Sequence, residues 1–226
     1  MDFSPLWISL ITAITATFIT FFLGLGAAHF MYTYHGRMKV WIDGILILPM
    51  VLPPTVIGFV LLVLLGKNGP VGQLLWKLGI TIIFSWPAAV IASTIVAFPM
   101  MYKTSLAALE QIDKDILDAA RTLGSSEWRI FWKIAVPLSW PGIVAGTILS
   151  FARAIGEFGA TLMIAGNIPG KTQTIPMAIY FAVEGGEIKR GLIWVAMIIA
   201  IALMAVLGLR VWSKNRLSVF YCMGDK

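Results

Sequence analysis

Charged residues are scarce in this chain. Asp, Glu, Lys and Arg make up 12% of its 226 residues, whereas hydrophobic residues make up 59%. A soluble domain carries about a quarter charged residues. The scarcity argues against a water-soluble globular protein. The hydrophobic residues also lie in runs long enough to cross a bilayer, which takes about 20 helical residues.

Cysteine and histidine are nearly absent too. The single cysteine, Cys222, can form no intrachain disulfide and has no metal-ligand spacing around it, so we interpret it as an incidental thiol. His29 and His35 do not have the i, i+4 spacing of a helical metal pair and are interpreted as interface residues. The hydrophobic runs also lack the paired carboxylates or the Ser–His set of a membrane-embedded hydrolase. We expect this chain to bind no metal or cofactor and to hold no catalytic residue.

Five hydrophobic runs are each about one helical crossing long. They cover residues 6–30, 41–65, 80–102, 134–152 and 192–211. A helix satisfies its own backbone hydrogen bonds in lipid, so each run is expected to be helical. The first run follows no basic segment and exceeds the core of a signal peptide, so we expect it to be retained. The predicted fold class is an all-α membrane protein, with one transmembrane domain over 1–226 and five spans.

Lys and Arg are concentrated in the segments on one side of these spans. Segments 31–40, 103–133 and 210–226 hold eleven of them, and the segments on the other side hold five. Positively charged loops stay in the cytoplasm, so we expect a multi-pass protein of the cytoplasmic (inner) membrane with its N-terminus outside and its C-terminus inside. Region 154–190 is then an external loop region. A re-entrant or interfacial helix around 175–183 is an open alternative there.

The net charge of +6 does not indicate nucleic-acid binding, because the basic residues form no stripe interleaved with aromatic residues. Trp7, Trp41 and Trp212 lie near the ends of runs and are interpreted as anchors at the membrane–water interface. Only fifteen residues run from Trp212 to Lys226, so we expect no regulatory domain there.

The second hydrophobic run contains more prolines than any other run. Pro49, Pro53 and Pro54 predict a bent helix pair, which we interpret as lining a pathway or gate; ordinary membrane-helix proline is the alternative. Pro99 in the third run is interpreted as ordinary, and Pro141 is expected to kink the start of the fourth. Gly142 and Gly146 predict a close helix–helix approach, within the chain or across a dimer.

The longest segment expected in the cytoplasm, 104–137, has a helical pattern. Apolar residues recur at three- and four-residue steps from Leu106 to Leu123 and predict one helix, which Gly124 ends. Ser125 or Ser126 is expected to cap a second, short helix with Glu127 in its first turn. Pro137 is expected to close this unit before the fourth span.

The polar face of this helix–turn–helix is rich in acidic residues. They are Glu110, Asp113, Asp115 and Asp118. A helix that rests on anionic lipid favours Lys and Arg instead, so a protein partner fits better than the alternative of an interfacial helix.

The spacing within this loop resembles a family signature. The pattern here is Asp118-Ala119-Ala120, three residues, Gly124, nine residues and Ile134-Ala135-Val136-Pro137. It resembles the EAA signature of ABC-importer permeases, which is Glu-Ala-Ala, three residues, Gly, nine residues and Ile-x-Leu-Pro. Asp118 replaces Glu and Val136 replaces Leu. The resemblance implies that loop 104–137 docks a separate ABC ATPase, and that the short helix around 125–131, which includes Trp128, is its coupling helix.

The resemblance extends over essentially the whole chain. Segments 139–147, 151–161 and 167–176 are very similar to molybdate permeases of the molybdate/tungstate/sulfate branch. This implies a type I ABC-importer permease fold and molybdate as cargo, with tungstate or sulfate as alternatives. It also implies four partners: a second copy of the chain, an ABC ATPase dimer that binds ATP and Mg²⁺, an extracytoplasmic oxyanion-binding protein, and membrane lipid.

Arg153 and Glu157 have i, i+4 spacing at the outer end of the fourth run. They could present a positive group to an oxyanion or help to close an outer gate. The alternative is a helix-face ion pair, which contributes about 0.2–0.5 kcal/mol.

Segment 166–172 resembles a phosphate-binding P-loop but does not match it. Its first glycine is one residue too close to Gly170-Lys171-Thr172, no strand precedes it, and it is expected outside the cell. We therefore expect no nucleotide site on this chain. An ATP-independent channel or ion-driven carrier is the alternative of another class. It would show charged residues at span centres or inverted repeats, and neither is evident.

Overall fold

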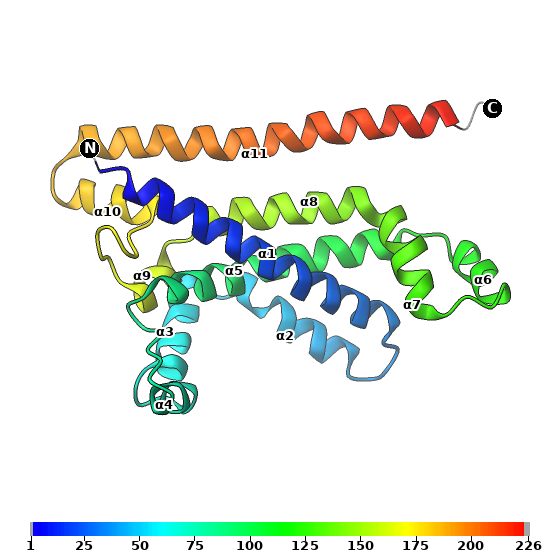
Figure 1. The fold of residues 1–226 in the computed structure, drawn as a ribbon, viewed down its shortest axis with the longest axis horizontal. Coiled ribbons are helices and arrows are strands. Elements are labelled where there is room, and N and C mark those ends of the chain that lie inside the picture. The colour runs from blue at the N-terminus through cyan, green and yellow to red at the C-terminus, as the bar shows by residue number, and fades with distance from the viewer. Residues whose placement is uncertain (1, 224–226) are drawn as a thin grey trace.

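The computed structural model describes residues 2–223, and every regular element in that range is a helix (Figure 1). The elements are α1 (Ser4–Thr33), α2 (Lys39–Val51), α3 (Pro54–Leu65), α4 (Pro70–Lys77), α5 (Trp86–Glu110), α6 (Lys114–Thr122), α7 (Glu127–Ile130), the π-helical turn η1 (Phe131–Ala135), α8 (Val136–Ile155), α9 (Gly159–Ala165), α10 (Ile175–Glu184) and α11 (Ile188–Met223). The side chains of Trp212 and Cys222 lie outside the described part.

Four helices in the described range are long and apolar enough to cross a membrane: α1, α5, the continuous helix Glu127–Ile155, and α11. The number is five if α2 and α3 form one broken span. Figure 1 shows α1, α5, α8 and α11 running along the long axis of the molecule, while α3 and α4 stand to one side. The N-terminus and α10 lie at one end of this bundle, the α10 end, and α6 and α7 lie at the other, the α6–α7 end.

The second predicted span is broken at its prolines. Helices α2 and α3 meet at 109°. Leu52 and Pro53 are both extended, with ψ of 142° and 136°. Each precedes a proline, and proline disfavours the helical conformation of the residue before it. Pro54 then begins α3, where its missing N–H costs nothing. The predicted bend is therefore confirmed, as a complete break, whereas Pro49 lies inside α2 without ending it.

Helix α5 is the centre of the bundle and packs against α1, α8, α2 and α9. Small residues let the helices approach closely. A Cβ on Gly142 would lie 2.4 Å from the Ala108 Cβ, and one on Gly146 would lie 3.1 Å from the Thr104 Cβ. The close approach predicted for these glycines is confirmed, and the neighbouring helix is α5 of the same chain. Helix α5 runs unbroken through Pro99.

Several predicted boundaries are wrong. The third span begins at Trp86 rather than at 80, because Pro87 favours a helix start there and the preceding residues form a turn in which Phe84 has φ of 60°. The fifth begins at Ile188 rather than at 192. Region 154–190 is not only loop, since it contains α9 and α10. Helix α10 covers the stretch where a helix was the open alternative.

Candidate functional site

Beyond the end of α5, segment 104–137 folds as two helices, α6 and α7, joined by a turn. Helix α6 is shorter than the first helix that the sequence predicts. The prediction of a single helix from 106 to 123 is wrong. Helix α5 extends to Glu110, and a separate helix, α6, starts at Lys114. Asp113 causes the restart, because its carboxylate accepts a hydrogen bond of 3.0 Å from the Asp115 N–H and so caps α6.

This break changes which apolar residues face the protein. Leu117 and Ala120 of α6 are buried, at 3% and 7% exposure. Ile116, Ala119 and Leu123 point away, and Leu123 is 86% exposed. Their three- and four-residue steps place them on one side of α6. The loop therefore has an exposed apolar stripe that its own chain leaves uncovered.

Gly124 ends α6 as predicted. Its φ of +77° lies in the left-handed region that favours glycine. The Gly124 N–H donates to the Arg121 carbonyl at 2.9 Å, and the Ser125 N–H donates to the Ala120 carbonyl at 3.1 Å. This is the hydrogen bonding of a glycine-capped helix end. Ser126 occupies the N-cap position of α7, but its side chain makes no capping hydrogen bond.

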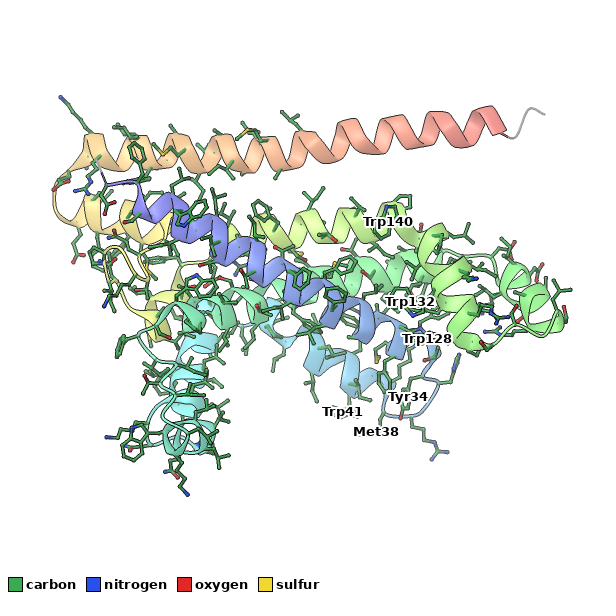
Figure 2. The ribbon with its side chains drawn as sticks, viewed as in Figure 1. Tyr34, Met38, Trp41, Trp128, Trp132 and Trp140 are labelled. Atoms are coloured by element: carbon green, nitrogen blue, oxygen red, sulfur yellow. The ribbon has the colours of Figure 1, made fainter. Side chains whose placement is uncertain are left out.

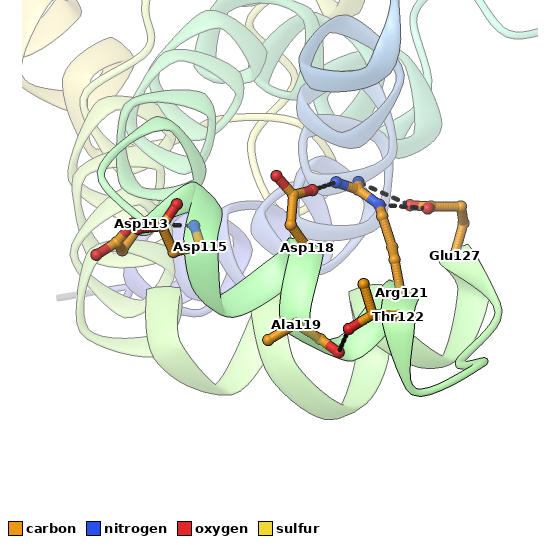
Figure 3. A network of polar contacts seen from close by, with 7 residues as sticks. All are labelled: Asp113, Asp115, Asp118, Ala119, Arg121, Thr122 and Glu127. Atoms are coloured by element: carbon orange, nitrogen blue, oxygen red, sulfur yellow. Dashed lines mark hydrogen bonds and ion pairs between the residues drawn. The ribbon is translucent and has the colours of Figure 1, made fainter.

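Arg121, which was not among the predicted site residues, joins the two helices across this turn. Figure 3 shows its guanidinium between two carboxylates. Nε and Nη2 donate to the Glu127 carboxylate at 2.7 and 3.1 Å, and Nη1 donates to Asp118 Oδ1 at 2.6 Å. The Glu127 and then the Asp118 hydrogen bonds raise the pKa of Arg121, so this side chain remains charged. The three-residue step from Asp118 to Arg121 was the available signal.

Pro137 does not close the loop. The chain is helical without interruption from Glu127 to Ile155, and the π-helical turn η1 precedes Pro137. In this wider turn the Val136 N–H bonds the Phe131 carbonyl. Pro137 directly follows this turn inside the continuous helix, and the wider π-helical geometry accommodates its missing N–H. Helix α7 is therefore rigidly continuous with a spanning helix.

Exposed aromatic residues surround this end of the bundle. Figure 2 shows Trp128, Trp132 and Trp140 along the α7–α8 helix, with Trp41 near the start of α2. Trp41 and Trp128 are 71% and 68% exposed. Tryptophan is enriched where a membrane meets water. At the start of α1, near the α10 end, Trp7 is 66% exposed and is placed to mark the opposite boundary.

Two polar contacts tie α2 to α5. Lys103 Nζ lies 2.8 Å from both carboxylate oxygens of Asp43, and the Tyr102 hydroxyl donates to the same carboxylate. No sequence pattern singles out Asp43. Its partners are about sixty positions away, so no local pattern reveals them.

The broken span packs against α9. A Cβ on Gly58 of α3 would lie 2.8 Å from the Ala160 Cα, and one on Gly159 would lie 3.2 Å from the Pro54 Cβ. The structure therefore brings Pro54 of the second span together with the segment that follows Arg153.

Glu157 connects α8 with α9. Its side chain is 1% exposed, and Oε2 lies 2.8 Å from Nη1 of Arg153, whose side chain is 30% exposed. Its other oxygen, Oε1, accepts a hydrogen bond of 2.9 Å from the Ala160 N–H. The i, i+4 ion pair is therefore present, but Glu157 lies in the buried corner beyond α8, which ends at Ile155, rather than on an exposed helix face.

Segment 166–172 forms a turn closed on itself. The Thr172 hydroxyl donates to the Gly166 carbonyl at 2.8 Å and accepts from the Ile168 N–H at 3.1 Å. The N–H groups of Lys171 and Thr172 bond the Ile168 carbonyl. These amides are used within the turn rather than turned toward a phosphate. Among the described residues, no group of three or more His, Cys, Asp or Glu side chains is placed to hold a metal ion.

Comparison with known proteins identifies the family. Residues 20–211 match the family model described as binding-protein-dependent transport system inner membrane component. A Bacillus subtilis (strain 168) protein that carries the name of a molybdenum transport permease is 45% identical over 203 residues, which is 89% of each chain. The molybdenum transport system permease protein ModB of Escherichia coli (strain K12) is 49% identical over 152 residues, which is 66% of each chain.

Other similarities bear on cargo and fold. A Chlorokybus atmophyticus protein that carries the name of a sulfate transport permease is 35% identical over 213 residues, covering 94% of this chain and 74% of its own. A solved structure of the MetNI methionine ABC transporter in an inward facing conformation superposes with a TM-score of 0.73 at 16% identity, over 93% of this chain and 94% of the other. The chain therefore has the fold of ABC-importer permeases and belongs to the family of binding-protein-dependent transport system inner membrane components, as a multi-pass inner-membrane protein.

Proposed function

We propose that this chain is the permease subunit of an ATP-driven ABC importer that carries molybdate across the cytoplasmic membrane. The observation that carries the proposal is the loop 104–137, where the signature residues Asp118 to Pro137 form an exposed helix–turn–helix at one end of the bundle. The concentration of Lys and Arg in the segments at this end supports a cytoplasmic location for it. The names of the molybdenum permease relatives support the cargo.

The exposed stripe of α6 and the short helix α7 form the proposed docking surface for the ATPase. Ile116, Ala119 and Leu123 are uncovered in this chain, and Trp128 extends the apolar area. A helix with an apolar face binds a partner by laying that face into a groove. The remaining docking residues are Asp118, Ala120, Gly124, Ser125, Ser126, Glu127 and Pro137. Ala120 packs inward, so its part is to hold α6 in place.

Continuity between α7 and α8 provides the mechanical connection. A force on α7 is transmitted along the helix from Glu127 to Ile155. Beyond its far end, the Glu157 corner holds α9, and α9 packs against α3. ATP-driven movement of the docking surface would thus reach the broken span, where Pro49, Pro53 and Pro54 with Arg153 and Glu157 are the proposed pathway or gate residues.

The proposed complex has two copies of this chain, because one chain offers one coupling loop and an ABC ATPase dimer has two ATP sites. ATP and Mg²⁺ would be bound by the ATPase. An extracytoplasmic oxyanion-binding protein would deliver the cargo at the α10 end.

Uptake of labelled molybdate by a strain that lacks this gene, with and without the gene restored, tests this function. We expect restored uptake that stops when ATP hydrolysis by the ATPase is blocked and that excess sulfate reduces only weakly. Equal competition by sulfate or tungstate would overturn molybdate as the preferred cargo. Uptake that persists without ATP hydrolysis would favour the alternative of a channel or ion-driven carrier.

A further inference from the structure

Arg153 lies within the depth of the membrane rather than at its surface. An α-helix rises 1.5 Å per residue, so Arg153 is about 20 Å along α8 from Trp140, which lies near the aromatic residues of the α6–α7 end. From the opposite side, its neighbour Ala154 packs with Ala13, which is about 9 Å along α1 from Trp7. The hydrocarbon core is about 30 Å thick. Both distances place Arg153 inside it.

The guanidinium is only partly satisfied by its own chain. Arg153 carries five N–H donors. Its ion-pair partner among the described residues is Glu157, through Nη1, and the Arg153 side chain remains 30% exposed. A guanidinium at this depth does not face lipid, because burying a charge in hydrocarbon costs several kcal/mol. Ionisable side chains at this depth face the interior of a helix bundle or a water-filled cavity, so the exposed part is assigned to such a cavity rather than to lipid.

The cavity is best assigned to the transport pathway. Arg153 is followed by the corner that packs on Pro54 and Thr55 of the broken span. Guanidinium matches oxyanion geometry because it donates two parallel hydrogen bonds to two oxygens of one group. Glu157, which is 1% exposed, neutralises the cation when no anion is present and fixes its direction, since Oε1 is itself held by the Ala160 N–H.

We propose that Arg153 directly contacts the tetrahedral oxyanion as it crosses the membrane, and that Glu157 is the counter-charge that positions it and lets the anion leave. The inference rests on the proposed function, because it names the intramembrane contact for the cargo of that importer. The proposal predicts that the positive charge of Arg153 contributes to transport by attracting the substrate, and not only by pairing with Glu157.

The test uses the complete complex in proteoliposomes, with its ATPase and binding protein, and measures initial rates of molybdate uptake. Arg153→Gln is expected to lower kcat/KM for uptake at least tenfold, and Arg153→Lys is expected to fall between it and the unmodified protein. Lys77→Gln removes one cation from α4, away from the bundle, and is the matched control that should transport normally. The melting temperature of each complex shows whether a loss comes from misfolding.

The double variant Arg153→Gln/Glu157→Gln separates the two roles. If Arg153 serves only to neutralise the buried carboxylate, removing both charges restores transport, and that result would overturn the proposal. If Arg153 contacts the oxyanion, the double variant stays as inactive as Arg153→Gln although its melting temperature recovers. An unmodified complex that carries neither molybdate nor sulfate would instead refute the proposed function, so the two failures are distinguishable.

Discussion

Lys103 Nζ lies 2.8 Å from both carboxylate oxygens of Asp43, and this contact joins the first half of the broken span to the helix that leads into the docking loop. Helix α2 has no buried residue of its own in the described chain. Its partly buried Ile42, Leu46 and Ile47 pack against the core, and the ion pair adds a polar contact to this packing. The pair therefore connects the helix that leads into the proposed docking loop with the element proposed to gate the pathway.

Asp43→Asn is expected to loosen α2 and to lower the rate of uptake by about three- to tenfold, because an amide forms a weaker hydrogen bond to Lys103 than a carboxylate does. Binding of the ATPase should be unchanged, since Asp43 lies outside loop 104–137. The two measurements are uptake into proteoliposomes and co-purification of the ATPase. A charge exchange, Asp43→Lys with Lys103→Asp, should recover part of the rate. Full activity of Asp43→Asn would contradict this role.

Arg121 is predicted to hold α6 and α7 in the orientation that the ATPase binds. Arg121→Gln removes the contacts to both Asp118 and Glu127, so we expect weaker ATPase binding, by about fivefold, with little change in thermal stability because exposed ion pairs stabilise a fold only slightly. Arg129→Gln removes an exposed cation from the neighbouring short helix α7 and is the control. If both variants bind the ATPase equally, Arg121 contributes charge alone and not geometry.

Gly124→Ala is expected to destabilise the turn by about 1 kcal/mol, because alanine pays a steric cost at the φ of +77°. Gly44→Ala is the matched control. Gly44 lies within α2, and a Cβ there would meet nothing within 4 Å, so the change should be neutral or slightly stabilising. Thermal unfolding of the purified complexes measures both. Equal melting temperatures would show that the turn does not require glycine.

Gly58→Ala is expected to push α3 away from α9, because the new Cβ would lie 2.8 Å from the Ala160 Cα and backbone cannot move aside easily. Overpacking of this kind costs about 1–3 kcal/mol. Uptake should fall together with the melting temperature. Gly26→Ala, where a Cβ would meet nothing within 4 Å, should leave both unchanged. Normal uptake by Gly58→Ala would show that α3 and α9 need not stay in contact.

The sequence predicted four long apolar helices, the bend at Pro53 and Pro54 and the Gly124 turn. Each follows from local chemistry: apolar length, the conformation before proline and the left-handed region. The sequence could not predict that the helix would restart at Asp113. The apolar steps continue through that break, and only packing decides that Leu117 turns inward while Ile116 turns outward.

Contacts between distant segments were beyond the sequence as well. Arg153 and Glu157 were recognised as a pair by their spacing, but the burial of Glu157 depends on α9 folding back over it. Pro137 was expected to end a helix because proline usually does so. The preceding π-helical turn lets the chain continue, and that geometry has no local signature.

Cysteine crosslinking between the loop and the ATPase tests the central claim most directly. With Cys222 changed to Ser, Ser126→Cys at the start of α7 should crosslink to a cysteine in the surface groove of the ATPase, and the yield should change when ATP is bound. Lys171→Cys, in the 166–172 turn beyond α9, should give no crosslink. An intact complex in which Ser126→Cys gives no crosslink, or in which Lys171→Cys does, would contradict the account.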